Sequence, residues 1–310
     1  MKTETLRIIY PQWEGGNRFV YAFGAKILSY LSPDSEDETL ELPLVEEYPT
    51  MIEDGIAYKS SILKQANELL NTLKTKKPGK LVVFGGDCSI SLAPFTYLLD
   101  KYGIKNTAIL WIDRHGDISV TGETTDYHAM VLSSFLGEGD VDFREFVTQK
   151  IDISHVLHIG VNDTEKEFSR SLGQKYAFNN VPPEAFANNS DAVLNKLRSM
   201  NVANILIHLD IDVLDLSSFR SQSSANPDVY FDRLKIIKPG AAFEAITRLL
   251  QDIDHLYNIV GLSIAEYLPW DLMNLSKMLS ELPLLRKKMT FVVHMLNNDN
   301  IIHNSYLRYM

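Results

Sequence analysis

The chain of 310 residues contains a single cysteine, Cys88. One thiol cannot form an intrachain disulfide, which excludes the class of small secreted proteins held together by disulfides and favours a reducing compartment. The amino-terminal residues lead into a short strand-like run and lack the apolar segment of a secretory signal. No apolar stretch approaches membrane-spanning length. We therefore expect a cytoplasmic protein that does not associate with membranes.

Positive charge is also scarce. Lys and Arg together number 30 against 40 Asp and Glu, which gives a formal net charge of −10 at pH 7. The basic residues are scattered along the chain, whereas proteins that bind nucleic acids gather them on a surface that follows the phosphates. The sequence therefore predicts no nucleic-acid partner.

Linkers rich in Gly, Ser or Pro are absent, as are internal repeats, which predicts one α/β domain over residues 1–310. Short apolar runs alternate with amphipathic runs, a rhythm typical of a mostly parallel sheet covered by helices on both faces. The predicted strands are residues 6–10, 81–84, 107–112, 156–161, 204–209, 259–264 and 290–294. The predicted helices are residues 19–30, 52–73, 91–102, 191–200, 239–253 and 270–282, and Pro239-Gly240 is expected to open the fifth of them.

Acidic side chains follow two of the predicted strands, at the point where each strand ends. The first cluster is Asp113, His115 and Asp117, and the second is Asp210, Asp212 and Asp215. Either cluster alone is compatible with a solvated turn and a helix cap. Alternation along a strand, however, puts residues spaced by two on one side, so that both clusters converge at one edge of the sheet. Crowded carboxylates repel unless they are protonated or bind cations, and oxygen ligands with an imidazole suit Mn²⁺. The sequence therefore predicts a two-metal hydrolytic centre.

Three further segments carry polar residues at strand ends or in loops. Gly85-Gly86-Asp87-Cys88-Ser89 follows a predicted strand, and its glycines permit a tight turn, but no Gly-Lys-Ser/Thr follows as a phosphate loop would require. Glu266 ends another strand and is either a ligand for a cationic substrate or an ordinary loop charge. His128 is either a proton shuttle near the metals or a histidine at a helix start.

Taken in order, these motifs resemble those of the arginase or ureohydrolase superfamily, which includes arginase, agmatinase, guanidinobutyrase and formimidoylglutamase. The matching motifs are Gly-Gly-Asp-x-Ser, Asp-x-His-x-Asp, a later His, Asp-x-Asp-x-x-Asp and a strand-ending Glu. The resemblance implies a single arginase-like domain with a three-layer α/β/α fold and a mostly parallel sheet of about eight strands. It also implies a homo-oligomer, either a trimer or a hexamer.

The resemblance further implies a pair of Mn²⁺ ions at the carboxyl ends of the strands. Asp113 and Asp210 would bridge the two ions, and Asp117 would complete the shell of the first. His115 and Asp212 would complete the shell of the second ion. A hydroxide bridging the ions, acidified by both, would attack the carbon of a guanidinium or amidine group.

The family likeness also assigns three residues to the substrate. Asp117 would pass the proton of the hydroxide to the leaving amine. Glu266 would hold the cationic nitrogens of the substrate, and His128 would aid proton traffic or substrate binding. These assignments imply a small guanidino or amidino compound as the partner of the site.

The chain departs from the family pattern at the first ion. Family members carry a metal-binding histidine where this chain has Cys88, which is either a thiolate ligand that favours zinc or iron or a buried thiol that coordinates nothing. His208 shares a strand face with Asp210, and it either compensates for the missing imidazole or is a core histidine.

The loops that would recognise the substrate depart as well. Arginase-like members carry an Asn and a Ser-Gly-Asn segment where this chain has Ser119 and Thr124-Thr125-Asp126. Arg220 is either a ligand for a substrate carboxylate or an exposed loop residue. Arginase activity itself is therefore not the predicted specificity.

The sequence thus predicts a metal-dependent hydrolase of a linear C–N bond in a guanidino, amidino or formimino compound. The alternative is a catalytically weakened arginase-fold protein with partial or no metal, acting as a binding or scaffold protein. A deacetylase of a related fold would need a paired-histidine motif, and the chain has no His-His pair.

Overall fold

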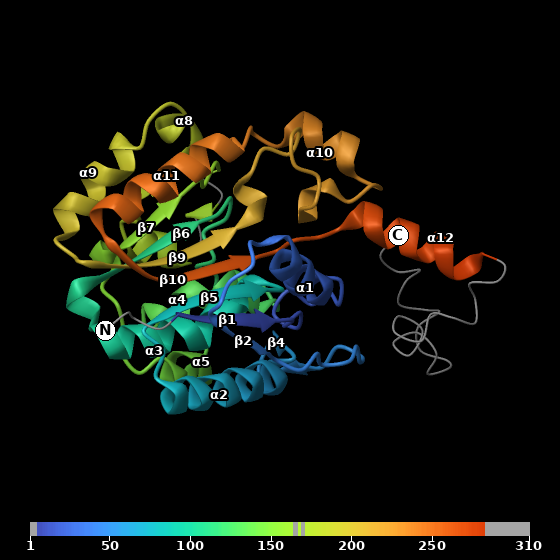
Figure 1. Cartoon of the computed structure of the whole chain (residues 1–310), viewed down its shortest axis with the longest axis horizontal. Helices are drawn as coiled ribbons and strands as arrows, with labels where there is room; N and C mark the ends of the chain where they lie inside the picture. The colour runs from blue at the N-terminus through green and yellow to red at the C-terminus, as the bar shows by residue number, and fades with distance from the viewer. Residues whose placement is uncertain (1–4, 164–166, 169–170, 283–310) are drawn as a thin grey trace.

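A parallel sheet of eight strands forms the centre of the computed structural model, which describes residues 5–163, 167–168 and 171–282 (Figure 1). In spatial order the strands are β2 (Glu38–Glu41), β1 (Thr5–Tyr10), β5 (Lys80–Gly85), β10 (Asn258–Ala265), β9 (Asn204–Asp210), β6 (Thr107–Ile112), β7 (Val156–Ile159) and β8 (Asn180–Val181). Every pairing between these strands is parallel. Parallel pairing brings the carboxyl ends of all eight strands to one edge of the sheet.

Helices cover both faces of this sheet, as Figure 1 shows. One face carries α2 (Lys59–Lys76), α3 (Leu92–Tyr102), α4 (Val131–Phe135) and α5 (Val141–Phe146), and the other carries α8 (Pro183–Phe186), α9 (Asp191–Met200) and α11 (Phe243–Leu256). The buried apolar residues of β6 divide between them: Ile109 and Trp111 join the first core, and Ala108, Leu110 and Ile112 join the second. A strand that is apolar on both faces is typical of a buried parallel sheet. The predicted three-layer α/β/α fold is confirmed.

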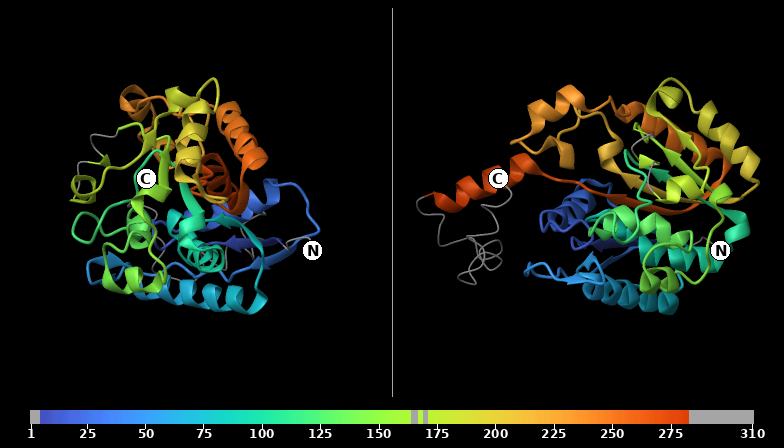
Figure 2. Two further views of the ribbon diagram at one scale, coloured as in Figure 1. Left: turned by 90° about the vertical axis from the view of Figure 1, so that its left-hand side faces the viewer. Right: turned by 180° about the vertical axis from the view of Figure 1, so that it is seen from behind.

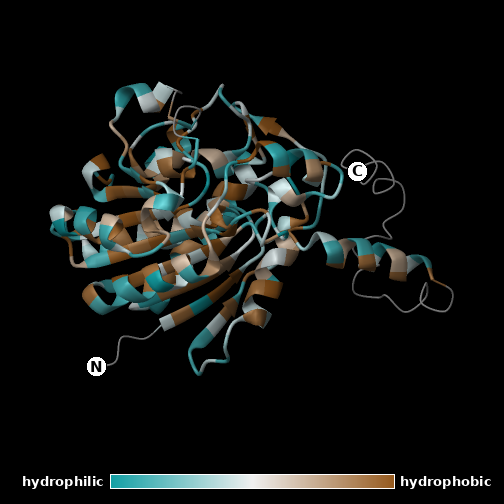
Figure 3. Cartoon of the chain, turned by 90° about the horizontal axis from the view of Figure 1, so that it is seen from above, coloured by the Kyte–Doolittle hydropathy of each residue, from teal (hydrophilic) through white to brown (hydrophobic). Residues whose placement is uncertain are grey.

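Four further α-helices complete the described part of the chain, and the first of them packs against β1 and β5. They are α1 (Tyr21–Leu31), α7 (Ser171–Lys175), α10 (Tyr230–Ile236) and α12 (Trp270–Glu281). Figures 1 and 2 show α12 extending away from the body of the molecule, and none of its residues is buried. In Figure 3 the strands are mostly brown, whereas the outer helices alternate between brown and teal, as amphipathic helices do. Within the described part of the chain, no helix has the length and apolar character needed to cross a membrane.

Most of the predicted elements are confirmed. The first six predicted strands correspond to β1, β5, β6, β7, β9 and β10, while the seventh, at residues 290–294, lies outside the described residues. The strands β2 and β8 were not predicted. Because β2 is a polar edge strand within an acidic segment and β8 has two residues, neither carries an apolar alternation that a sequence pattern could reveal.

Two predicted helix starts are wrong. Residues 52–57 form the antiparallel hairpin β3 (Ile52–Glu53) and β4 (Ile56–Ala57), and α2 begins only at Lys59. The turn of this hairpin is Asp54-Gly55, whose positive φ angles of 51° and 83° match the Asp-Gly preference of tight hairpins. Pro239-Gly240 does not open α11 either, because the Gly240 amide donates to Asp215 Oδ2 at 2.9 Å.

A buried lysine joins α2 to the segment that begins α5. Lys59 Nζ lies 2.9 Å from Asp54 Oδ2, 2.9 Å from Asp140 Oδ2 and 2.7 Å from Asp142 Oδ2. The side chains of Lys59 and Asp140 are 5% and 8% exposed, whereas the other two partners are largely exposed. Burial opposes the charge of Lys59, but the three carboxylates outweigh it and raise its pKa well above the ordinary value.

Replacing Lys59 should therefore destabilise the fold. We expect Lys59→Met to lower the free energy of unfolding by about 3 kcal/mol, because Asp140 would keep a buried charge without its partner. The control is Lys26→Met, which breaks the half-exposed 2.8 Å pair with Glu41 and should cost less than about 1 kcal/mol. Urea titration measures both values, and equal losses in the two variants would contradict the assignment.

Candidate metal centre

Four neighbouring strands bring the predicted site residues to one place. The strands β5, β10, β9 and β6 are adjacent in space, although they are far apart in sequence. The carboxyl end of β5 leads into Cys88, and that of β10 leads into Glu266. The end of β9 leads into Asp210 and Asp212, and the end of β6 leads into Asp113, His115 and Asp117. A crevice at the carboxyl edge of a parallel sheet is the usual ligand site of open α/β folds.

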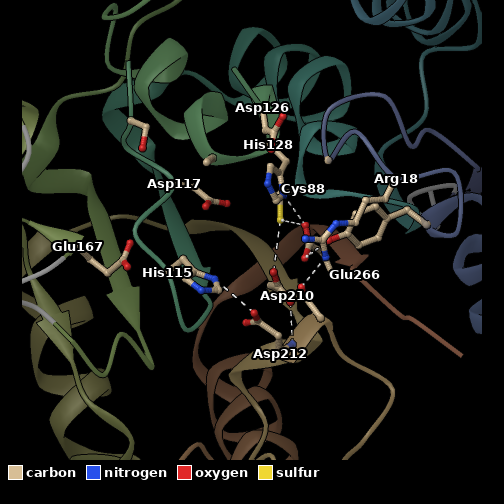
Figure 4. Close-up of a pocket in the computed structure, with 15 residues that line it drawn as sticks. Arg18, Cys88, His115, Asp117, Asp126, His128, Glu167, Asp210, Asp212 and Glu266 are labelled. Atoms are coloured by element: carbon tan, nitrogen blue, oxygen red, sulfur yellow. Dashed lines mark hydrogen bonds and ion pairs between the residues drawn. The ribbon is translucent and has the colours of Figure 1, made fainter. Parts of the chain in front are cut away.

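These residues line a pocket, shown in Figure 4. The sulfur of Cys88 points between Asp210 and Glu266, and His115 points toward Asp212 (Figure 4). The lining consists of Gly16, Arg18, Tyr21, Cys88, His115, Asp117, Ser119, Asp126, His128, Ala129, Glu167, Asp210, Asp212, Ser223 and Glu266. Of the predicted metal and substrate residues, Asp113 is absent from this lining because it is fully buried beneath it.

The first metal-capable group lies between β6 and β9. Asp113, His115, Asp210 and Asp212 each offer a ligand atom, and these atoms all lie within 4.8 Å of one another. His115 Nδ1 is 3.4 Å from Asp113 Oδ1 and 3.3 Å from Asp212 Oδ2. The predicted convergence of the two acidic clusters is therefore present in the structure.

The same local turn fixes both aspartate clusters. The amide of His115 donates to Asp113 Oδ1 at 2.7 Å, and the amide of Asp212 donates to Asp210 Oδ1 at 2.7 Å. An aspartate that accepts from the amide two residues on forms an Asx turn, which ends the strand and directs the next side chain inward. This is the physical reason for an Asp-x-His or Asp-x-Asp spacing at each strand end.

A second metal-capable group contains Cys88, Asp113, Asp117 and His208, whose ligand atoms also lie within 4.8 Å of one another. Asp117 Oδ2 and His208 Nε2 are buried, and neither has a hydrogen-bond partner in the part of the chain that the structure describes. The ring of His208 stacks on Trp111 with a centroid separation of 3.8 Å. Burial lowers the pKa of His208 to about 4, so its imidazole is neutral.

The third group joins Cys88 to the predicted substrate residues. Cys88 Sγ lies 3.4 Å from both Asp210 Oδ2 and Glu266 Oε1. Glu266 Oε1 is 2.6 Å from His128 Nδ1, and its Oε2 accepts from the Tyr21 hydroxyl at 3.1 Å. Burial opposes charge on His128, but Glu266 outweighs it and raises the pKa of His128 to about 9. The pair is therefore an ion pair at neutral pH.

Burial and mutual repulsion oppose ionisation of the acidic groups. Burial raises the pKa of Asp210 well above its ordinary value, and the charge of Asp212 raises it further. Burial likewise raises the pKa of Asp212 to about 6, although His115 partly offsets this. The pKa of Asp117 is raised by burial and by Asp113. A bound cation would reverse this balance by stabilising the charged form of each carboxylate.

The donor atoms fit divalent ions. Among the described residues, neither carboxylate oxygen of Asp212 nor Oδ2 of Asp117 has a hydrogen-bond partner, and all three are buried. Asp212 Oδ2 does lie 3.3 Å from His115 Nδ1. Leaving such atoms unsatisfied costs free energy, and a cation between them would satisfy them. The set combines carboxylates with imidazole, which suits Mn²⁺, and adds one thiol, which suits zinc or iron better.

Two site residues adopt a strained backbone conformation. Asp117 has a φ of 48° and Glu266 a φ of 66°, in the left-handed region that non-glycine residues seldom occupy. The amide of Glu266 donates to the carbonyl of Gly86 at 2.7 Å, which ties the end of β10 to the loop after β5. Strain of this kind persists where the surrounding structure fixes a side chain for a function.

Two residues considered from the sequence lie elsewhere. Asp215 accepts from the amides of Ser217 and Gly240 at 2.9 Å each and belongs to none of the metal-capable groups among the described residues. Arg220 is exposed and does not line the pocket. Asp215 is therefore a turn residue, and Arg220 is not positioned to meet a substrate there.

The segment after β1 supplies pocket residues that sequence reasoning missed, Gly16, Arg18 and Tyr21. A side chain at position 16 would bring its Cβ within 2.4 Å of the Tyr21 ring, so this position requires glycine. The pair Gly15-Gly16 after a predicted strand was the available signal, because glycines at a carboxyl edge permit close backbone approach. Ser223, which accepts from Arg18 Nη1 at 2.9 Å, and Glu167 carried no such signal.

Comparisons with known proteins agree with this fold. The model of the arginase family matches residues 50–271. An arginase from Plasmodium berghei is 26% identical over 219 residues, covering 66% of this chain and 58% of that protein. The chain spans about half the length of the curated relatives it matches.

Two solved arginases show the same fold. The arginase of Entamoeba histolytica in complex with L-ornithine gives a TM-score of 0.70 at 16% identity, covering 86% of this chain and 91% of that chain. The arginase of Bacillus caldovelox gives a TM-score of 0.70 at 18% identity with the same coverage of both chains. Since the family model covers most of the sequence and the fold agrees, this chain belongs to the arginase family.

Proposed function

We propose that the protein is a metal-dependent hydrolase that cleaves a linear C–N bond in a guanidino, amidino or formimino compound. The observation that carries this proposal is the convergence of buried carboxylate oxygens without hydrogen-bond partners, next to imidazoles and a thiol, in a pocket at the carboxyl edge of the sheet. Membership of the arginase family supports it.

Two divalent cations would occupy this pocket. Asp113, which belongs to both the first and the second metal-capable group, would help to hold both ions. Asp210, His115 and Asp212 would hold one of them, and Asp117 would contribute to the other. When bound, the ions supply a water that is acidic enough to act as a nucleophile near neutral pH. Manganese as the metal, one domain over residues 1–310, a trimeric or hexameric assembly and a cytoplasmic location stay predictions from the sequence.

Asp117 is suited to hold the proton that the leaving nitrogen needs. Burial and the neighbouring Asp113 raise its pKa, and its Oδ2 makes no hydrogen bond within the described protein. A carboxyl group whose pKa is raised toward neutrality can accept a proton from a nucleophilic water and return it to an amine.

Glu266 is suited to hold the cationic end of the substrate. Burial alone would raise its pKa, but His128 outweighs burial and lowers it, so the carboxylate stays charged. The hydroxyl of Tyr21 and the ring of His128 fix its two oxygens. Because the side chain of His128 is 25% exposed, it can also exchange protons with solvent.

The side chains at the entrance of the pocket include both positively and negatively charged groups. Arg18 and Asp126 line it together with Glu167. A guanidinium and carboxylates near the entrance suit a substrate whose far end carries a carboxylate or an amine. We infer that Arg18 contributes to substrate recognition, a role for which the sequence alone offers Arg220 as a candidate.

Metal content tests the proposal directly. We expect two equivalents of divalent metal in protein purified without chelator, and a loss of about one equivalent in Asp212→Asn, which would remove a carboxylate ligand. The matched control is Asp215→Asn, which removes a carboxylate from the adjacent turn and should keep both equivalents. Absence of metal from the native protein would favour a binding or scaffold role instead.

Activity should depend on Glu266. Against a panel of guanidino, amidino and formimino compounds, with and without a terminal carboxylate, we expect metal-dependent release of urea, ammonia or formamide from one member. Glu266→Gln should lower kcat/KM by about a hundredfold, as loss of a buried charge partner does. Steady-state kinetics measure this effect, and silence of the native protein across the panel under several metals would contradict the proposal.

Stabilisation by metal should rise with pH. Below about pH 6, Asp212 of the metal-free folded protein is protonated, and a cation must displace this proton in order to bind. Above about pH 6, Asp212 is ionised and no proton competes with the cation. The increase in melting temperature on adding metal should therefore be larger at pH 7 than at pH 5. At a metal concentration a hundredfold above Kd, binding should add about 2.7 kcal/mol to the free energy of unfolding. A shift of the same size at both pH values would count against direct ligation.

A further inference from the structure

The first-ion side of the centre has an unusual pair of donors. Cys88 stands where family members carry a histidine, and a different buried histidine, His208 on β9, lies beside it. Their ligand atoms lie within 4.8 Å of each other and of ligand atoms of Asp113 and Asp117. The four residues are between 0% and 6% exposed. Two buried carboxylates, a thiol and an imidazole therefore meet in one small volume.

One nitrogen of His208 is held and the other has no partner. Nδ1 lies 2.8 Å from the Ser91 hydroxyl and 3.2 Å from the Ser263 hydroxyl, while Nε2 is buried without a hydrogen bond. Stacking on Trp111 fixes the plane of the ring. A histidine that binds a metal has this arrangement, with one nitrogen hydrogen-bonded to the protein and the other directed at the ion.

A second histidine shows that a buried, unpartnered nitrogen does not by itself make a metal ligand, and that other ligand atoms must lie near it. His158 on β7 pairs with Trp111 from the opposite side to His208, and it too is fully buried with one unpartnered nitrogen. Its Nε2 lies 2.9 Å from the Gly116 carbonyl. It belongs to none of the metal-capable groups among the described residues, so it provides a matched control.

We propose that Cys88 and His208 together hold the first ion with Asp113 and Asp117, in a thiolate, imidazole and carboxylate site that prefers Zn²⁺, Fe²⁺ or Co²⁺ to Mn²⁺. In family members the imidazole comes from the loop after β5. In this chain His208 on β9 supplies the imidazole, and the shorter Cys88 stands at the position of the family histidine. Binding of the ion forms a metal–sulfur bond and releases the thiol proton to water. This inference rests on the proposed function, because it assumes that the pocket binds two ions.

The two halves of the centre then differ in metal preference. The group formed by Asp113, His115, Asp210 and Asp212 offers three carboxylates and one imidazole, which suit manganese. The group containing Cys88 adds a soft thiolate, which suits zinc, iron and cobalt. A protein exposed to a mixture of metals should therefore acquire a mixed pair of ions.

Cobalt loading provides the test, because a thiolate bound to Co²⁺ gives a charge-transfer absorption band in the near ultraviolet. We expect the band and two cobalt equivalents in the native protein, and no band in Cys88→Ser. His208→Asn should weaken binding of the first ion at least about tenfold while leaving the second unchanged. His158→Asn should keep both ions and the band.

A rescue variant separates ligation from packing. The double variant Cys88→His with His208→Asn returns an imidazole to the position after β5, and it should recover two equivalents without the band. If His208 were only a packing residue, its replacement would leave cobalt affinity and the band unaltered, and this would overturn the inference. Two bound ions without a band in the native protein would overturn it as well, while the proposed function would stand. No bound metal at all would overturn both.

The native protein also allows a test that needs no variant. X-ray absorption at the zinc edge of zinc-loaded protein should show one sulfur ligand and two imidazole ligands in total for the two zinc ions. A spectrum without sulfur, or with one imidazole, would contradict the assignment even if the His208 variants failed to fold.

Discussion

Repulsion between buried carboxylates is the constraint on which this structure depends. Asp113, Asp210 and Asp212 are at most 1% exposed and offer oxygens within 4.8 Å of one another. Two unit charges 4 Å apart repel by about 4 kcal/mol at an effective dielectric constant of 20, and removal from water adds a penalty for each ion. The protein alone relieves this only in part, through His115, two backbone amides, the indole of Trp111, which donates to Asp113, and the thiol of Cys88, which donates to Asp210. Cations in the pocket would turn the same geometry from unfavourable to stabilising.

The fold supplies the rigidity that holds these charges together. Parallel strands align their carboxyl ends, and the spatial order of β5, β10, β9 and β6 brings together segments that are distant in sequence. Close backbone approach then requires glycine: a Cβ on Gly86 would lie 1.7 Å from the Gln12 carbonyl. Asp117 and Glu266 complete the site in left-handed conformations that the surrounding contacts impose. The site is therefore a property of the sheet edge, and no single loop creates it.

The sequence predicts the sheet and the acidic clusters well, for physical reasons. Buried strands such as β6 are continuous apolar runs, and Asp-x-His-x-Asp at a strand end has few purely structural explanations. The sequence does not predict features that depend on three-dimensional proximity. The sequence leaves open whether His208 compensates for the missing imidazole or is a core histidine, and only the structure shows that a nitrogen of its ring lies close to the sulfur of Cys88. The sequence carries no signal for Arg18, which the structure shows to line the pocket. The hairpin at residues 52–57 was missed because its Asp54-Gly55 turn lies inside an apparently helical pattern.

The central claim is that cations hold these buried carboxylates, and a crystal structure with anomalous diffraction data tests it most directly. Crystals of protein grown with manganese and zinc, measured on either side of each absorption edge, would locate each metal separately. We expect two anomalous peaks between β6, β9 and the loop after β5, with zinc on the side of Cys88 and His208 and manganese on the side of His115. A pocket without anomalous peaks, with ordered waters hydrogen-bonded to Asp117 and Asp212, would contradict it.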